Sequence, residues 1–407
     1  MGRRIAIVGG GPSGSSFAIS LVRLGVDPRD LVILDKAEFP RPKLCGGGVT
    51  WRGTQLLEEL LGTRPTDGGE TRGLAFRSAL GEFEVKERGP QWLYDRSVLD
   101  HQLLSAAVAL GVELRQGTAV TGIEAAPEGF RVRTGSTSET FDWVVGADGA
   151  RGLVRREFDL PGGIVGRLLE AVFEPVSADV DNGLLYFDFD PVLEGIPGYA
   201  WIFPYPKPGA SNLYKLGIMD GRGVAPGAAL RDWTMDYAER HGFRLVDSKL
   251  QGWPEHYYSR KAKSHVPGVV LVGEAFGIDP LLGEGIAPAI EQARYAARRV
   301  KSALDAGTKK IRAYELGYLL TPEGRNLYYQ GQLADRLYGK HPYRWMRVLF
   351  ENPAIASIAG SGHVAYGRMT ARSGALTLAF AWQTLRQGFP SNAPVSRLLP
   401  PAASAPR

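Results

Sequence analysis

The sequence predicts an α/β protein whose N-terminal part folds around a parallel sheet, and three consecutive segments support this prediction. Arg4–Val8 is short and apolar, as expected of a buried strand, and Leu31–Leu34 has the same character. Between them, Ser15–Leu24 has the composition of a helix, and Gly25 stands where that helix should end. A strand, a helix and a second strand in this order form the crossover unit of parallel sheets.

The turn between the first strand and the helix is rich in glycine. Gly9, Gly11 and Gly14 have the spacing G-x-G-x-x-G around Ser13, and Asp35 follows the second strand. The first glycine permits a tight turn, the second lets the backbone approach a pyrophosphate, and the third lets helix and strand pack closely. The helix N-terminus attracts phosphates, and Asp35 can accept hydrogen bonds from a ribose. These features predict dinucleotide binding without distinguishing FAD from NAD.

Later segments continue this pattern. The segment between Gly273 and Ile286 includes Glu274 and Gly285, so a second glycine turn would bring a carboxylate and bare backbone toward a ligand. Further elements are expected around it, namely strands at Val112–Val120, Phe130–Arg133, Phe141–Val145 and Val269–Val272, and a helix at Ala289–Ala303.

Length and composition limit the class of protein. At 407 residues the chain exceeds one ordinary folding unit, so we expect two or three domains. Its 44% hydrophobic and 22% charged residues exclude a disordered or fibrous chain. Cys45 is the single cysteine, which rules out a disulfide within the chain and predicts a cytoplasmic location. No signal peptide is visible, and no apolar run is long enough to span a membrane.

The charge is unevenly distributed along the chain. The formal net charge is +5, and the basic excess lies in the C-terminal quarter, residues 301–407. Such an excess is typical of a solvated face or of peripheral contact with an anionic membrane at the inner face. No zinc-ligand spacing or nucleic-acid-binding motif is present, so we predict neither a metal site nor nucleic-acid binding. The basic residues stand near apolar ones, the cluster being Arg336, Lys340, Arg344 and Arg347 with Tyr338, Tyr343, Trp345, Met346 and Phe350.

Two further motifs carry a resemblance to a known family. Pro40–Gly48 contains a cysteine followed by three glycines, and Pro197–Pro204 contains Y-x-W-x-F-P. With the glycine turn at the N-terminus and Ala147-Asp148-Gly149, they resemble the geranylgeranyl reductase family of flavoproteins over about residues 1–300. The resemblance implies the fold of p-hydroxybenzoate hydroxylase and glutathione reductase. This is an FAD-binding Rossmann domain with an inserted β-sheet substrate domain and a helical C-terminal region.

The resemblance also implies the domain boundaries and the site. The FAD domain would comprise 1–165 and 265–300, with 51–94 partly contributing to the β-rich substrate domain at 166–264. The remainder, 301–407, would be mostly helical with a loose tail. Family members usually have aspartate where this chain has Glu274. The implied FAD-binding residues are Gly9, Gly11, Ser13, Gly14, Asp35, Cys45, Gly46, Gly48, Arg96, Val120, Asp148, Glu274, Gly285 and Ile286.

The implied activity is reduction of carbon–carbon double bonds in a polyprenyl chain on a lipid, quinone or terpenoid. Hydride would come from flavin N5, and an acid would protonate the second carbon. Tyr199, Trp201 and Phe203 alternate along one strand and would form an aromatic wall for the apolar prenyl chain. Cys45 is a candidate either for the acid or for packing beside the flavin.

Two alternatives and the reductant stay open at this point. A flavin-dependent monooxygenase or halogenase has the same fold, and Y-x-W-x-F-P partly matches the halogenase motif W-x-W-x-I-P. An FAD-binding electron carrier is the non-enzymatic alternative. The chain contains one complete dinucleotide fingerprint, so NAD(P)H would bind transiently, or a ferredoxin-like protein would reduce the flavin.

Overall fold

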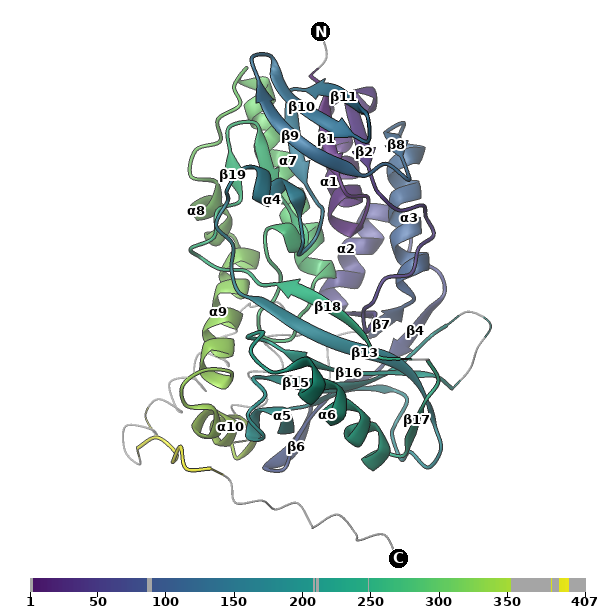
Figure 1. Cartoon of the computed structure of the whole chain (residues 1–407), viewed down its shortest axis with the longest axis vertical. Helices are drawn as coiled ribbons and strands as arrows, with labels where there is room; N and C mark the ends of the chain where they lie inside the picture. Colours follow the sequence, from purple (N-terminus) through teal and green to yellow (C-terminus); the bar gives the residue numbers. More distant parts are fainter. Residues whose placement is uncertain are drawn as a thin grey trace, which may run out of the picture.

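The described part of the chain forms two large sheets, one in each half of the molecule (Figure 1). The structure is a computed structural model that describes residues 3–85, 90–207, 209, 212–247, 249–352, 382 and 388–394. One sheet has six strands and the other has eight. Long connections run between the two halves, so both contribute residues to the region between them.

The six-stranded sheet has the predicted parallel arrangement around the first strand. The neighbours of β1 are β12 and β2, both parallel to it, and only β19 runs antiparallel. All four residues of β1 are buried, as expected for a parallel strand covered on both faces. In spatial order the strands are β19 (His265–Val266), β20 (Val269–Leu271), β12 (Trp143–Gly146), β1 (Ile5–Val8), β2 (Leu31–Leu34) and β8 (Glu113–Arg115).

Helices and a small antiparallel sheet cover this sheet. Helix α1 contacts both α3 and α7, and α2 packs against α7. Phe130 and Phe141 of the small sheet contribute to the same hydrophobic core. The covering elements are α1 (Pro12–Arg23), α2 (Trp51–Leu61), α3 (Arg96–Ala109), α4 (Leu153–Glu157), α7 (Ile286–Asp305), β9 (Val120–Ala126), β10 (Gly129–Thr134) and β11 (Thr137–Phe141).

Several predicted boundaries differ from the structure. Helix α1 begins at Pro12 rather than Ser15. Proline is favoured at the first position of a helix, because the N–H that it lacks would have no partner within the helix there. Helix α7 begins at Ile286, directly after Gly285, rather than at Ala289. The strand predicted at Phe141–Val145 is two strands in different sheets, because Asp142 turns the chain and its side chain accepts a hydrogen bond from Arg4 N. The segment predicted at 112–120 is likewise divided between β8 and β9.

The eight-stranded sheet dominates the other half. Strand β14 pairs in parallel with β5, which comes from the segment 51–94, so this early segment extends the later sheet. The strands are β17 (Phe243–Leu245), β13 (Val165–Pro175), β16 (Tyr214–Asp220), β15 (Gly198–Pro204), β14 (Leu184–Asp188), β5 (Gly73–Ser78) and β6 (Gly81–Val85), with β18 (Gln251–His256) paired to β13.

The two faces of this sheet have different partners. Helix α6 (Gly227–Arg240) covers one face, where Trp233 and Tyr237 pack against Ile218 and other residues of a separate core cluster. The opposite face has Tyr199 and contacts α9 (Pro322–Leu337) and α10 (Pro342–Phe350) through Leu337 and Phe350. The smaller elements are α5 (Asp190–Leu193), α8 (Tyr314–Leu319) and a three-stranded sheet of β3 (Gly48–Val49), β7 (Gln91–Tyr94) and β4 (Gly68–Thr71).

The C-terminal region is helical as far as the structure describes it continuously. Helices α8, α9 and α10 follow the end of α7. The loose tail is predicted from about Ser391; residues 391–394 have no helix or strand, and the rest of the tail lies outside the described residues. Tyr338, Met346 and Phe350 of the basic cluster are buried in the core. Within the described residues, no helix is both long and apolar enough to cross a membrane.

Candidate functional site

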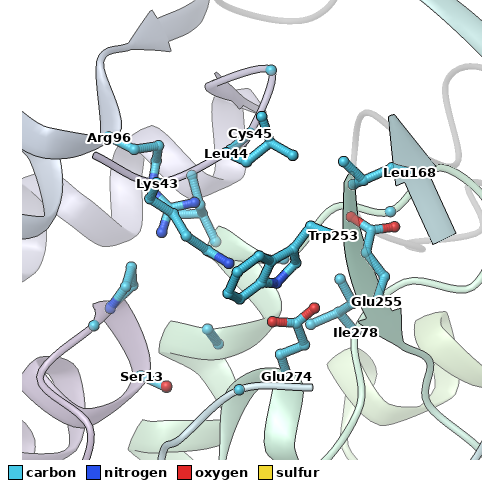
Figure 2. Close-up of a pocket in the computed structure, with 18 of the residues that line it drawn as sticks. Ser13, Lys43, Leu44, Cys45, Arg96, Leu168, Trp253, Glu255, Glu274 and Ile278 are labelled. Carbon is cyan, nitrogen blue, oxygen red and sulfur yellow. The ribbon is translucent and has the colours of Figure 1, made fainter. Parts of the chain in front are cut away.

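A cavity of about 920 Å³ lies between the two sheets, and residues from both halves line it (Figure 2). It contains nearly every residue that the sequence predicts for FAD or substrate. Gly14 is the exception, since it lies behind the first turn. The predicted residues that line the cavity are Gly9, Gly11, Ser13, Asp35, Cys45, Gly46, Gly48, Arg96, Val120, Asp148, Tyr199, Trp201, Phe203, Glu274, Gly285 and Ile286.

The glycines of the first turn have three different environments. Gly9 has a φ of +106°, and a Cβ there would lie 2.4 Å from Ala147 O. A Cβ at Gly14 would lie 1.9 Å from Gly9 O, so this glycine allows α1 to pack on the turn. A Cβ at Gly11 would meet no atom closer than Arg41 Nη2 at 3.6 Å, so Gly11 leaves open space at the N-terminus of α1. That space suits a phosphate group.

Asp35 is fixed at the edge of the cavity by its own backbone surroundings. Its Oδ2 accepts a hydrogen bond from Gly10 N at 2.7 Å, and its Oδ1 accepts one from Ala37 N at 2.8 Å. Each carboxylate oxygen has a second lone pair that can accept a ribose hydroxyl. The position of Asp35 therefore fits the predicted contact with a nucleotide.

Two other predicted residues lie near the same end. Val120 begins β9 and lines the cavity. Asp148 lies before α4 and accepts a hydrogen bond from Val154 N at 2.9 Å, and burial raises the pKa of its carboxyl. Asp148 thus stabilises the start of a short helix beside the cavity.

The loop after Cys45 is held by contacts from three directions. Gly47 has a φ of +81°, and a Cβ there would lie 2.3 Å from Tyr94 O. A Cβ at Gly46 would lie 2.7 Å from the ring of Phe203, so the loop packs directly on β15. Lys215 Nζ donates a hydrogen bond to Cys45 O at 2.5 Å. These contacts fix the position of the loop, whose glycines line the cavity with their backbone.

Lys215 and Glu170 form a buried ion pair beneath this loop. Lys215 Nζ lies 3.5 Å from Glu170 Oε1, and both side chains are less than a tenth exposed. Burial raises the pKa of Glu170, and the charge of Lys215 acts in the opposite direction. These two residues lie on different strands, β13 and β16, and no sequence motif marks either of them.

Arg96 lies at the start of α3 and faces the cavity from the same side as Cys45 (Figure 2). Its guanidinium makes two hydrogen bonds to the fully buried Asp100, at 2.7 and 3.1 Å. Arg41 Nη2 also lies 3.4 Å from the Asp100 carboxylate. Asp100 therefore orients Arg96 and offsets part of the positive charge beside the cavity.

The late glycine loop is held in place by a carboxylate and two tyrosines. Asp279 accepts hydrogen bonds from Leu281 N at 2.7 Å and Leu282 N at 3.1 Å, and burial raises its pKa to about 7. Tyr199 OH donates to Leu282 O at 2.5 Å, and Tyr338 OH donates to Leu281 O at 2.7 Å. These bonds fix the loop whose next residues present their backbone to the cavity.

The early and late glycine loops are joined directly. Thr50 Oγ1 donates a hydrogen bond to Glu284 Oε1 at 2.9 Å, between Gly283 and Gly285 in the chain. A Cβ at Gly273, which has a φ of +64°, would lie 2.6 Å from Ser13. The late segment therefore contacts both the loop after Cys45 and the N-terminus of α1.

Lys43, Glu274 and Glu255 line the cavity and influence one another electrostatically. Lys43 Nζ lies 3.8 Å from the ring centroid of Trp253, and Figure 2 shows Glu274 below that ring and Glu255 on the side away from Lys43. Burial lowers the pKa of Lys43 and raises the pKa of Glu274. Burial, together with the charge of Glu274, raises the pKa of Glu255 to about 8. No sequence pattern groups Lys43 with Trp253 and Glu255, because they come together only through folding.

The remaining wall of the cavity is apolar. Tyr199, Trp201 and Phe203 share the face of β15 that lines the cavity, as their alternation predicts. The ring centroids of Tyr199 and Trp201 are 5.9 Å apart, and those of Trp201 and Phe203 are 6.4 Å apart. Aliphatic and aromatic side chains of other elements extend this wall, namely Leu74, Leu168, Leu185, Phe187, Met219, Ile278 and Leu282.

These features fit FAD as the ligand of the glycine-lined part. Gly11 leaves space at a helix N-terminus for phosphate, and Asp35 can accept bonds from a ribose. Gly48, where a Cβ would meet no atom closer than 3.7 Å, leaves space at the loop after Cys45. The apolar wall then borders the region that remains for a second ligand. The cavity can therefore bring an apolar substrate next to a dinucleotide cofactor.

Comparisons with known proteins agree with this architecture. Residues 3–182 match the model of an FAD binding domain. The menaquinone reductase of Mycobacterium tuberculosis is 30% identical over 330 residues, covering 73% of this chain and 76% of the relative. The digeranylgeranylglycerophospholipid reductase of Thermoplasma acidophilum is 26% identical over 74% of this chain and 78% of the relative.

Solved structures share the fold at low identity. A geranylgeranyl bacteriochlorophyll reductase-like protein from Thermoplasma acidophilum has a TM-score of 0.68 and 19% identity, covering 93% of this chain and 96% of that one. The flavin-dependent brominase Bmp2 has a TM-score of 0.69 and 19% identity, covering 95% and 100%. At these identities the likeness establishes the fold of the chain and leaves its chemistry open.

Proposed function

Because the chain belongs to the geranylgeranyl reductase family of FAD-dependent oxidoreductases, we propose that it saturates carbon–carbon double bonds in a polyprenyl chain. The observation that carries this proposal is the apolar wall of Tyr199, Trp201 and Phe203 in the same cavity as the glycine-lined cofactor region. Relatives named for reduction of menaquinone or of a digeranylgeranylglycerophospholipid support a prenylated quinone or lipid as the substrate class.

The residues around the cavity would act on such a substrate mainly by position and by exclusion of water. Reduced FAD, when bound, supplies the hydride. The rings of Tyr199 and Trp201 would hold the prenyl chain by apolar contact, and Phe203 would set its distance from the loop at Gly46. An isolated alkene has no polar group to bind, so shape must supply most of the orientation.

An anaerobic reduction assay tests this function. The FAD-loaded protein is reduced with dithionite and incubated with menaquinone or with a digeranylgeranylglyceryl phospholipid, and the products are analysed by mass spectrometry. We expect mass gains in steps of two hydrogens on the prenyl chain. Unchanged prenyl chains despite a reducible flavin would contradict the proposal. NAD(P)H and a reduced ferredoxin are compared with dithionite in parallel, to identify which electron donor reduces the bound flavin.

The sulfur of Cys45 is not expected to be the essential proton donor. Its backbone carbonyl is bound by Lys215, and its Sγ lies 3.4 Å from Gly47 N, which donates to it. Because a serine Oγ can accept the same hydrogen bond from Gly47 N, we expect Cys45→Ser to bind FAD and to retain turnover within about threefold of the wild type, as measured by stopped-flow reoxidation of the reduced flavin. A loss of a hundredfold or more with normal FAD content would instead support Cys45 as the acid.

The alternative chemistry on this fold is oxygenation or halogenation. Lys43 lines the cavity, but it belongs to the loop that contains Cys45, and its Nζ packs over the ring of Trp253 on β18. Supplying reduced flavin, O₂ and chloride or bromide, and searching for oxygenated or halogenated products, distinguishes the two reaction classes. An electron carrier would show flavin reduction without either product.

Peripheral contact with an anionic membrane remains a separate proposal. Arg336 and Lys340 are exposed, whereas Arg344 and Arg347 donate hydrogen bonds to backbone carbonyls of residues 390–393. We expect co-sedimentation with liposomes that contain anionic lipid at low salt, and weaker binding for Arg336→Gln with Lys340→Gln. Equal recovery with neutral and anionic liposomes would contradict this proposal.

A further inference from the structure

We propose that Glu255 is the acid that protonates the alkene carbon in this reaction, an inference that rests on the proposed function. Glu255 lies on β18 and lines the cavity together with the apolar wall. It is a cavity-lining carboxyl group that no part of the cofactor fingerprint accounts for. The side chain of Glu255 lies deep in the protein, and the part of it that is accessible faces the cavity.

The carboxyl group of Glu255 is held against the late glycine loop. Tyr257 OH donates a hydrogen bond to Glu255 Oε2 at 3.1 Å. A Cβ added at Gly283, which has a φ of +70°, would lie only 2.9 Å from the same oxygen. Glycine at this position therefore allows the carboxyl group to pack on the backbone beside Gly285. Figure 2 shows Glu255 next to Leu168 and Ile278, two apolar residues of the cavity.

The charges around Glu255 favour its protonated form. Glu274 faces it from the 3₁₀ turn Gly273–Ala275, Asp279 faces it from the late loop, and Lys43 is the cation that acts on both glutamates. Arg96 acts on Glu274, which further favours ionisation of Glu274 rather than of Glu255. At Glu255 the charge of Lys43 opposes those of Glu274 and Asp279, and burial adds to the effect of the two carboxylates, so Glu255 is the member of the pair that retains its proton.

The tyrosines near Glu255 complete this environment. Tyr257 is its hydrogen-bond donor on the same strand, Tyr199 approaches from β15, and Tyr338 follows α9. Burial raises the pKa of all three hydroxyls well above the usual value, so they stay neutral and cannot take the proton from Glu255. The pKa of about 8 for Glu255 then means that the acid form prevails at neutral pH.

In the reduction step, one alkene carbon accepts the hydride supplied by the reduced flavin. The electron pair of the double bond forms a C–H bond to the other carbon with the proton from Glu255. The substrate gains two hydrogens, Glu255 becomes a carboxylate, and the flavin is left two electrons more oxidised. Dithionite restores the flavin in the test, and water restores the proton on Glu255.

The test compares Glu255→Gln with the wild type in anaerobic single turnovers between pH 6 and pH 10. The wild-type rate should fall as the pH rises through about 8, because the acid form is lost. Glu255→Gln should be at least tenfold slower and lack this pH dependence, while Glu255→Asp should recover part of the rate. Glu291→Gln is the matched control, since burial also raises the pKa of Glu291 to about 8 but Glu291 does not line the cavity.

A measurement without turnover separates this inference from the proposed function. Infrared difference spectra of ¹³C-glutamate-labelled, FAD-loaded protein at pH 6.5 and pH 9.5 should show a carboxylic acid band that Glu255→Gln weakens, and Glu291→Gln identifies the part of the band that belongs to Glu291. If the wild type reduces no prenyl probe, the proposed function is wrong and the donor role falls with it. If the wild type reduces the probe and Glu255→Gln is equally fast, or if the band is unchanged in that variant, Glu255 is not the acid.

Discussion

Replacing Lys215 with methionine is expected to lower the free energy of unfolding by about 3–5 kcal/mol and to reduce FAD occupancy. The substitution leaves Glu170 buried without its cation, 2% exposed in a strand of the eight-stranded sheet. It also removes the hydrogen bond to Cys45 O that holds the loop beside the cofactor region. Denaturant unfolding and the absorbance ratio of bound flavin to protein measure the two effects.

The pH dependence of this loss identifies its cause. Burial already raises the pKa of Glu170, and the loss of Lys215 raises it further. When the pKa of a carboxyl group is higher in the folded than in the unfolded protein, the folded protein loses stability as the pH rises from the unfolded-state pKa through the folded-state pKa. The destabilisation by Lys215→Met should therefore be larger at pH 8 than at pH 5.5.

Two further variants serve as controls for Lys215→Met. Adding Glu170→Gln should recover most of the stability, because no unpaired buried charge remains. It should not recover the FAD occupancy, since the donor to Cys45 O is still absent. Lys207→Met changes an exposed lysine in the segment between β15 and β16 and should be neutral. Wild-type stability of Lys215→Met would show that the ion pair contributes nothing.

Gly14→Ala is expected to produce a protein that folds poorly and does not retain FAD. The new Cβ would lie 1.9 Å from Gly9 O, and backbone atoms of a turn between a buried strand and a helix cannot move aside cheaply. We expect a loss of about 3 kcal/mol or more in the free energy of unfolding. Soluble yield, circular dichroism and flavin content after purification report this loss.

Gly11→Ala is the informative comparison, because a Cβ at Gly11 meets no atom of the protein within 3.5 Å. This variant should keep near-wild-type stability and bind FAD at least tenfold more weakly, since the methyl group would occupy space for the pyrophosphate. Gly227→Ala, at the open start of α6, should change neither property. Normal FAD affinity in Gly11→Ala would contradict the assignment of this turn to the cofactor.

The agreement between sequence and structure is strongest where one short segment contains the whole signal. The spacing of Gly9, Gly11 and Gly14 specifies a turn in which Gly9 has a positive φ and Gly14 has no room for a side chain, and the structure contains that turn between β1 and α1. The alternation of Tyr199 and Trp201 specifies one face of a strand, because successive side chains of a strand point to opposite sides. The predicted helix boundaries were less accurate. Helices α1 and α7 begin at Pro12 and Ile286, each about three residues before the predicted start, because the backbone geometry that begins a helix cannot be read from composition.

The sequence by itself determined the cofactor turn, the family and the aromatic face, because each depends on residues that are neighbours in the chain. Only the tertiary structure decided that Lys215 pairs with Glu170 beneath the loop after Cys45, and that Glu255 packs against Gly283 at the cavity between the two sheets. These pairs come from separate strands and loops, and their energies depend on burial and distance. Both quantities arise only when the two sheets close around the cavity.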